Sequence, residues 1–422
     1  MSGQLVPFGP GARVFIAVYL LSLLLIGYLG HRARRGNTLS EFYLAGRGVG
    51  LFVLVLTLYA TQYSGNTLFG FSGKTYRIGY AWIMSVHFMT AVIVFYLLFV
   101  PRLYEQARAK GFITPTDYLH ERFGSRAIDL LAPLIMVVAL ANFLLAQLVA
   151  MGRAMEGLTG AETGTAYTVG VIVLALIIVI YETLGGFRAV AWTDAIQGLI
   201  LITGFCILLV MVFMQFGSLG TATEMLLNSK DQHKVTPPQG PMLRQWGSYI
   251  VLVGLGAALY PQAIQRIYAA RSAATLRRSL AVMALLPLST TLVAVIVGIT
   301  AAAHLPGLAG VSSDRILSEF CRQIQESSFL GYALVVVLFA AILAALMSTA
   351  DSVLLSISSM LIKDIYLRFL HRDASERHLA VLGRGISWVV VGLMVAVAIG
   401  LNQREFDQKT TLIQLLELKF EI

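Results

Sequence analysis

The chain has 422 residues, of which 57% are hydrophobic and 13% charged, and its net charge is +9. Soluble proteins are about half apolar and a quarter charged, so the composition excludes a single large soluble core. The basic residues stand in short loops between apolar runs, where they orient a membrane protein, and this placement argues against a nucleic-acid partner.

Ten apolar runs are long enough to span a hydrocarbon core, which takes about 20 residues each. We predict membrane helices at 12–31, 49–71, 78–100, 127–151, 165–184, 190–215, 246–269, 278–303, 329–361 and 384–402. An eleventh run begins near Thr411, and the chain stops soon after it. This pattern predicts a truncated eleventh span, with a short amphipathic tail as the alternative.

The charges of the loops predict an orientation. If the N-terminus lies outside, the inside loops hold 18 Lys and Arg residues and the outside loops hold 10. Because cytoplasmic loops carry the excess of basic residues, we expect the N-terminus outside a cell (inner) membrane that the chain crosses many times.

Two of the predicted helices are interrupted near mid-depth. The second contains the polar run 61–67, with Gly65 in it, and the seventh contains Gly254, Gly256 and then Pro261. Breaks in hydrocarbon expose unpaired backbone groups and are tolerated where they line a cavity. The two helices are first in successive groups of five, the spacing that indicates a transporter site. Close packing at the glycines is the alternative.

The ninth predicted helix carries hydroxyl groups beside a carboxylate. Ala345, Ser348, Thr349 and Ser352 share one helical face, and Asp351 adjoins it. Hydroxyl and carbonyl oxygens suit a hard monovalent cation. Alternatively, the hydroxyls bond back to carbonyls of their own helix.

Two further polar residues have open roles. Asp194, near the start of the sixth predicted helix, either caps that helix or contacts an ion. His87 either forms a structural hydrogen bond or lines a pocket. The middle of the predicted helices holds no Lys or Arg, which favours a neutral or zwitterionic solute.

Enzyme motifs are missing from the sequence. It contains no HExxH, no GxSxG and no phosphate-binding loop, and no cysteine pair has metal-ligand spacing. We therefore expect no enzyme activity and no organic cofactor.

Four segments resemble those of the sodium:solute symporter family, the group of the sodium–galactose, sodium–proline, pantothenate and sialic-acid transporters. They are FYLAGRGVG at 42–50, GGFRAVAWTD at 185–194 with Gln197, QR at 265–266 followed by AARS at 269–272, and AALMST at 344–349 with DIY at 364–366. The resemblance implies Na⁺-coupled symport of a small solute by a monomer.

The resemblance also implies an all-α, leucine-transporter-type fold with inverted five-helix repeats. In this single transmembrane domain (1–422), 1–48 would form an extra helix and loop, 49–215 the first repeat, and 246–422 a second, incomplete repeat. A sodium ion would lie at Ala60, Tyr63, Ala345, Ser348 and Thr349. A second sodium, found in some members, would use Asp194, Ser348, Asp351 and Ser352. The expected solute pocket contains Gln62, Ser64, Asn66, His87, Tyr260 and Gln262.

Three positions depart from known members of the family. Asp351 replaces a serine of the second sodium site, Gln62 replaces an aspartate of the proline carriers, and His87 replaces a glutamate of the sugar carriers. Proline and sugars are therefore disfavoured, and a proton-coupled carrier that uses Asp351 is an alternative. A sensor is another alternative, because membrane domains of this family also occur fused to signalling kinases.

Overall fold

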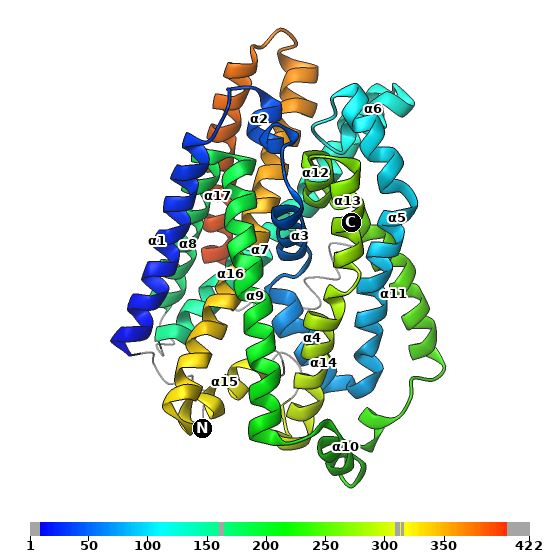
Figure 1. The fold of residues 1–422 in the computed structure, drawn as a ribbon, viewed down its shortest axis with the longest axis vertical. Coiled ribbons are helices and arrows are strands. Elements are labelled where there is room, and N and C mark those ends of the chain that lie inside the picture. The colour runs from blue at the N-terminus through cyan, green and yellow to red at the C-terminus, as the bar shows by residue number, and fades with distance from the viewer. Residues whose placement is uncertain (1–8, 160–163, 309–312, 314–315, 403–422) are drawn as a thin grey trace.

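The computed structural model describes residues 9–159, 164–308, 313 and 316–402, and within them the chain is helical (Figure 1). The first half contains α1 (Pro10–Arg32), α2 (Leu39–Leu44), η1 (Ala45–Arg47), α3 (Leu51–Gln62), α4 (Gly65–Ile78), η2 (Gly79–Ile83), α5 (Met84–Lys110), α6 (Thr116–Phe123), α7 (Arg126–Thr159), α8 (Gly164–Gly185) and α9 (Phe187–Phe216). The second half contains α10 (Leu219–Leu227), η3 (Gln232–Val235), α11 (Pro241–Ala258), α12 (Pro261–Ala269), α13 (Ala273–Met283), α14 (Leu286–His304), α15 (Ile316–Ser327), α16 (Phe329–Met360), the π-helix η5 (Leu361–Leu370) and α17 (Glu376–Asn402).

Eight of the described helical segments are long and apolar enough to cross a membrane, and the bent pair α11–α12 makes a ninth. The remaining predicted span, 49–71, is divided between α3 and α4. The predicted eleventh span, near Thr411, lies outside the described residues.

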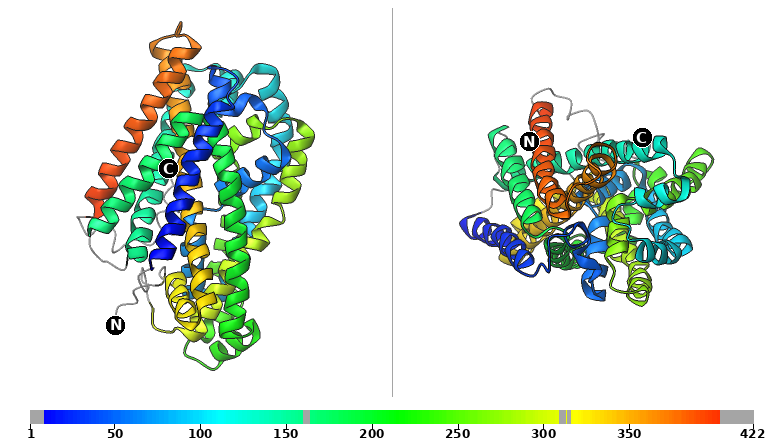
Figure 2. Two further views of the ribbon diagram at one scale, coloured as in Figure 1. Left: turned by 60° about the vertical axis from the view of Figure 1, so that its left-hand side comes forward. Right: turned by 90° about the horizontal axis from the view of Figure 1, so that it is seen from above.

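The long helices run side by side around α16 (Figures 1 and 2). This helix is buried without interruption from Leu338 to Met360 and packs mainly on α9 and α7. Apolar side chains such as Leu98 on α5 and Val389 on α17 are exposed at the outside of the bundle. That distribution fits helices whose outer faces meet lipid.

Small residues bring α1, α8 and α9 into close contact. A Cβ added at Gly27 would lie 2.4 Å from Cβ of Tyr181, and one at Gly185 would lie 2.4 Å from Cβ of Ala189. Gly186 adopts φ +60°, and a Cβ there would lie 2.5 Å from the carbonyl oxygen of Phe42. The pair Gly185-Gly186 therefore permits both the turn into α9 and the close approach of its neighbours.

The two interrupted spans are joined at one end. Val49, just before α3, accepts a backbone hydrogen bond from Arg271 at 2.9 Å, and its own N–H donates to Ala269 at 3.1 Å. The start of the first interrupted span is thereby fixed to the end of the second.

Candidate functional site

The first interruption separates α3 from α4. Tyr63 (φ −107°, ψ 99°) and Ser64 (φ −96°, ψ 176°) leave the helical conformation, and both are buried. The last carbonyl groups of a helix have no partner within it, so the end of α3 presents oxygen atoms to the protein interior.

Hydroxyl groups of α16 lie against this break. Ser348 Oγ donates to the Ala60 carbonyl at 3.2 Å and lies 3.3 Å from the Ala345 carbonyl. Thr349 Oγ1 donates to Ala345 at 3.0 Å. The hydroxyls thus bond back to their own helix, as the alternative predicted, but Ser348 also reaches across to α3. The structure brings four of the five predicted first-site residues together, and Tyr63 lies at the break beside them.

The predicted second-site residues form a buried ionic cluster. Asp194 Oδ2 forms an ion pair with Arg266 at 2.7 Å and accepts a hydrogen bond from Thr57. Asp351 Oδ2 accepts from the Tyr181 hydroxyl at 2.5 Å, and its Oδ1 accepts from Ser352 at 3.1 Å. Arg266 also donates to Ser352, which joins the two carboxylates into one cluster.

This cluster corrects two expectations. Asp194 does not cap its helix, because α9 already begins at Phe187 and Asp194 lies two turns further on. Arg266, near the end of the predicted span 246–269, is fully buried in α12, so the described interior does hold a cation. Its Nε donates to Thr57 Oγ1 at 2.8 Å and its Nη1 donates to the Gln262 carbonyl at 2.9 Å.

The buried cluster carries a net charge of −1 if both carboxyl groups are ionised. One guanidinium group faces two carboxylates, and Asp194 Oδ1 is buried without a hydrogen-bond partner among the described residues. Buried charges are stable when they are paired, so this arrangement can accept one further cation.

The second interruption separates α11 from α12, which are bent by 52°. Tyr260 adopts ψ 126°, and Pro261 opens the next helix. The Tyr260 ring lies 6.4 Å from the ring of Phe143 on α7. Gln262 is fully buried, and neither amide atom of its side chain has a partner among the described residues.

The other predicted pocket residues divide into three groups. Ser64 lies at the first break, and Gln62 Nε2 donates to the Tyr96 hydroxyl at 2.7 Å. The side chain of Asn66 lies outside the described part of the structure. The prediction that His87 lines the pocket is wrong, as the next paragraph explains.

His87 is exposed on the outer face of α5. It shares a helical face with Val94 and Leu98, which are 52% and 68% exposed, and its ring centroid lies 5.0 Å from that of Trp246 on α11. Since Val94 and Leu98 face outward from the bundle, His87 points in the same direction.

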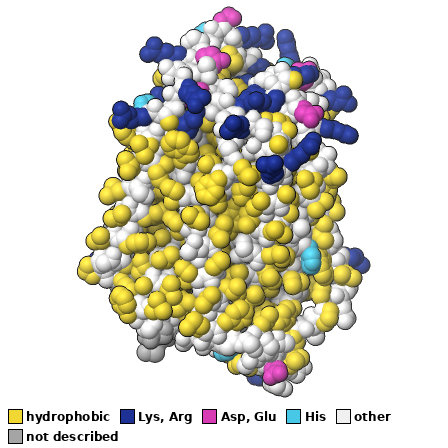
Figure 3. All heavy atoms as spheres, viewed as in Figure 1, with side chains coloured by type: hydrophobic (Ala, Val, Ile, Leu, Met, Phe, Trp, Pro, Cys, Tyr) yellow, Lys and Arg dark blue, Asp and Glu magenta, His cyan; other side chains and the backbone are white. Residues whose placement is uncertain are grey.

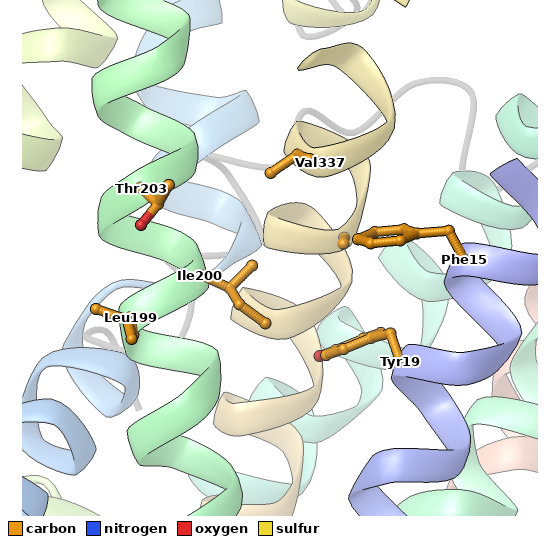
Figure 4. Close-up of a pocket in the computed structure, with 7 residues that line it drawn as sticks. Phe15, Tyr19, Leu199, Ile200, Thr203 and Val337 are labelled. Carbon is orange, nitrogen blue, oxygen red and sulfur yellow. The ribbon is translucent and has the colours of Figure 1, made fainter. Parts of the chain in front are cut away.

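One cavity of about 200 Å³ lies between α1, α9 and α16 (Figure 4). Its lining consists of Phe15, Tyr19, Leu199, Ile200, Thr203, Val337 and Ala340. None of the predicted ion or solute residues lines it, so this cavity is separate from the two breaks.

Known proteins resemble this chain in sequence and in fold. The sequence model of the sodium:solute symporter family matches residues 42–421. The chain is 28% identical over 396 residues to the osmoregulated proline transporter OpuE of Bacillus subtilis, with 92% of this chain and 77% of the relative covered. It is 29% identical over 433 residues to a sodium/proline symporter of Haemophilus influenzae, covering 97% and 80%.

A solved structure shares the fold. A Na⁺-coupled sialic acid symporter in a substrate-bound, outward-open state superposes with a TM-score of 0.81, at 21% identity, over 95% of this chain and 83% of that one. The all-helical, leucine-transporter-type fold expected from the sequence is therefore confirmed.

Proposed function

The chain belongs to the sodium:solute symporter family, whose members are secondary transporters. From that premise we propose that its two breaks have different roles in sodium-coupled symport. Sodium binds to oxygens of Ala60, Tyr63, Ala345, Ser348 and Thr349, between the first break and α16. A small neutral or zwitterionic solute binds beside it, near Gln62, Ser64, Tyr260 and Gln262. Sodium and solute enter from outside, the breaks close around them, and both leave on the inner side.

One observation carries the assignment of the ion. Ser348 Oγ, on α16, lies 3.2 Å from a carbonyl oxygen exposed by the end of α3. Uncharged oxygens from two separate helices meet there at depth, and such donors suit a monovalent cation that must also be released. The inward sodium gradient drives the cycle, and each charge that crosses 100 mV adds ~2.3 kcal/mol.

The orientation, repeats and working unit are part of the same proposal. Figure 3 shows Lys and Arg side chains gathered at the end of the molecule that holds α2 and α6, away from the N-terminal end of α1. This supports an inside position for that end and an outside N-terminus. Residues 49–215 and 246–422 form the two repeats after an extra first helix, and one chain suffices for transport.

The double variant Ser348→Ala/Thr349→Ala tests the sodium site. We expect it to abolish sodium-dependent uptake in vesicles. In the purified protein it should also remove the stabilisation that NaCl gives over choline chloride, because a ligand stabilises only the state that it binds. Ser358→Ala is the matched control, since Ser358 lies on the same helix and its hydroxyl donates to the carbonyl of Leu355 in that helix. Undiminished uptake or unchanged stabilisation by sodium in the double variant would remove the ion role from α16.

A second cation is supported by the charge of the Asp194–Arg266–Asp351 cluster. The cluster has two carboxylates and one guanidinium. One sodium ion or one proton at Asp194, Asp351 and Ser352 would balance its charge. Uptake driven by a proton gradient in the absence of sodium would assign this position to a proton. Uptake that needs sodium under every gradient would assign it to a second sodium ion or to structure alone.

A further inference from the structure

Gln147 is a buried polar residue of the described structure whose side chain has no role in the ion site. It lies on α7, is fully buried, and neither its Nε2 nor its Oε1 has a hydrogen-bond partner among the described residues. Buried amides are normally paired, so an amide with both atoms unpaired requires an explanation, and a bound solute with donor and acceptor groups is one. Gln262 on α12 has the same two properties.

The two glutamines belong to one region. Gln147 lies one turn after Phe143 on the same face of α7, and the Phe143 ring contacts that of Tyr260 at 6.4 Å. Gln262 follows Tyr260 by two residues, in the first turn of α12. The Phe143–Tyr260 ring pair at the second break thus lies one helical turn from Gln147 along α7 and two residues from Gln262 along the chain, and both amides are unpaired among the described residues.

Gln265 shows the paired state of a buried glutamine. Gln265, one turn further along α12, donates from Nε2 to Ser359 at 2.5 Å and accepts from Ser356 at 2.7 Å. Within the described residues, both amide atoms of Gln265 are thus paired, whereas neither amide atom of Gln147 or Gln262 is.

We propose that Gln147 and Gln262 bind the solute directly and select a group that both donates and accepts hydrogen bonds without a net charge. An amide side chain offers two donor hydrogens and one acceptor oxygen, which matches a hydroxyl group, an amide or the paired charges of a zwitterion. Arg266, the buried cation nearest in sequence to Gln262, is already paired with Asp194 and does not anchor a net anion. This inference rests on the proposed function and names the solute class of that site.

Gln147→Met and Gln262→Met test the proposal, because methionine keeps a similar length and removes the amide. The probes are L-proline, L-glutamine and D-galactose as uncharged or zwitterionic solutes, and L-glutamate and sialic acid as anions. In proteoliposomes with a sodium gradient, we expect each variant to raise the KM for the transported neutral probe about 10- to 100-fold, since each loses hydrogen bonds to the solute. The maximal rate should change less.

Thermal unfolding without solute separates binding from structure. Replacement of an unpaired buried amide by an apolar group should raise the Tm of Gln147→Met or leave it unchanged, because no hydrogen bond is lost. Gln265→Met is the matched control: both of its amide atoms are paired, so its Tm should fall while the KM stays the same. A lowered Tm in Gln147→Met together with an unchanged KM would overturn the inference.

Three further outcomes distinguish failure of this inference from failure of the proposed function. If the parent protein takes up only the anionic probes, the proposed solute class is wrong, although sodium coupling stands. If Gln147→Met keeps the parent KM while Ser348→Ala/Thr349→Ala loses sodium dependence, the inference fails and the proposed function survives. If the parent protein shows no sodium-dependent uptake of any probe, both fail.

Discussion

Both interrupted spans present polar groups at a break in the helix, but the polar groups differ between the two breaks. At the first break the exposed carbonyl of Ala60 meets a hydroxyl from α16, so oxygen atoms converge there. At the second break the chain bends at Tyr260, and the amide of Gln262 remains unpaired among the described residues. Carbonyl and hydroxyl oxygens suit an ion, whereas an amide, which both donates and accepts, suits an organic solute.

Three contacts link the two breaks. Arg266 of α12 donates to Thr57 of α3, and Val49 pairs with the backbone just after α12. The Tyr96 hydroxyl of α5 accepts from Gln62 and lies 3.4 Å from the Ala257 carbonyl, near the end of α11. Binding of an ion or a solute at one break can therefore affect the other, because hydrogen bonds and packed side chains connect the two breaks. Contiguous contacts of this kind can carry energetic coupling.

The largest expected effect is at Arg266. Arg266→Met removes the only cation that the described structure places against Asp194 and should lower the free energy of unfolding by about 3–5 kcal/mol, because a buried carboxylate is left without its partner. Thermal unfolding in detergent measures this loss.

The double variant Arg266→Met/Asp194→Asn is its control. Without either charge it should recover much of the lost stability, since an apolar or neutral replacement of a whole buried pair is often tolerated. A double variant as unstable as Arg266→Met alone would show that the guanidinium acts through packing on Phe187, whose ring centroid lies 5.5 Å away, rather than through the ion pair.

A smaller effect is expected at Tyr96. Tyr96→Phe removes the hydroxyl that binds Gln62 and approaches Ala257, and should cost about 0.5–1.5 kcal/mol of stability, the net value of a typical hydrogen bond. If Tyr96 couples the breaks, the variant should also weaken the dependence of solute KM on sodium concentration. An unchanged dependence with lowered stability would limit this contact to packing.

The sequence was sufficient for the helices and for the first break. Gly65 follows the first interruption and Pro261 the second. The spacing of Ser348 and Thr349 correctly placed their hydroxyls on one face with Ala345. The sequence was insufficient for Arg266, which stands near the end of the predicted span 246–269, because its burial and its ion pair with Asp194 depend on neighbours from other helices.

The face of a membrane helix is equally hard to infer from sequence. His87 is polar and mid-span, but the lipid-facing and core-facing sides of α5 are both apolar, so periodicity does not say which side it occupies. The unpaired amides of Gln147 and Gln262 are a property of their neighbours in space, and sequence alone does not reveal it.

The smallest expected effect concerns the bend itself. Pro261 stands at the first position of α12, where its fixed φ and missing N–H are both compatible with the helix start. Pro261→Ala should therefore cost only about 0.4–1 kcal/mol, chiefly through greater freedom of the unfolded chain. The solute KM should rise modestly, because Tyr260 and Gln262 flank the substituted residue, while stabilisation of the purified protein by NaCl should stay as in the parent. Loss of the sodium effect in Pro261→Ala, as large as in Ser348→Ala/Thr349→Ala, would show that the two breaks form one site and that the division between ion and solute is wrong.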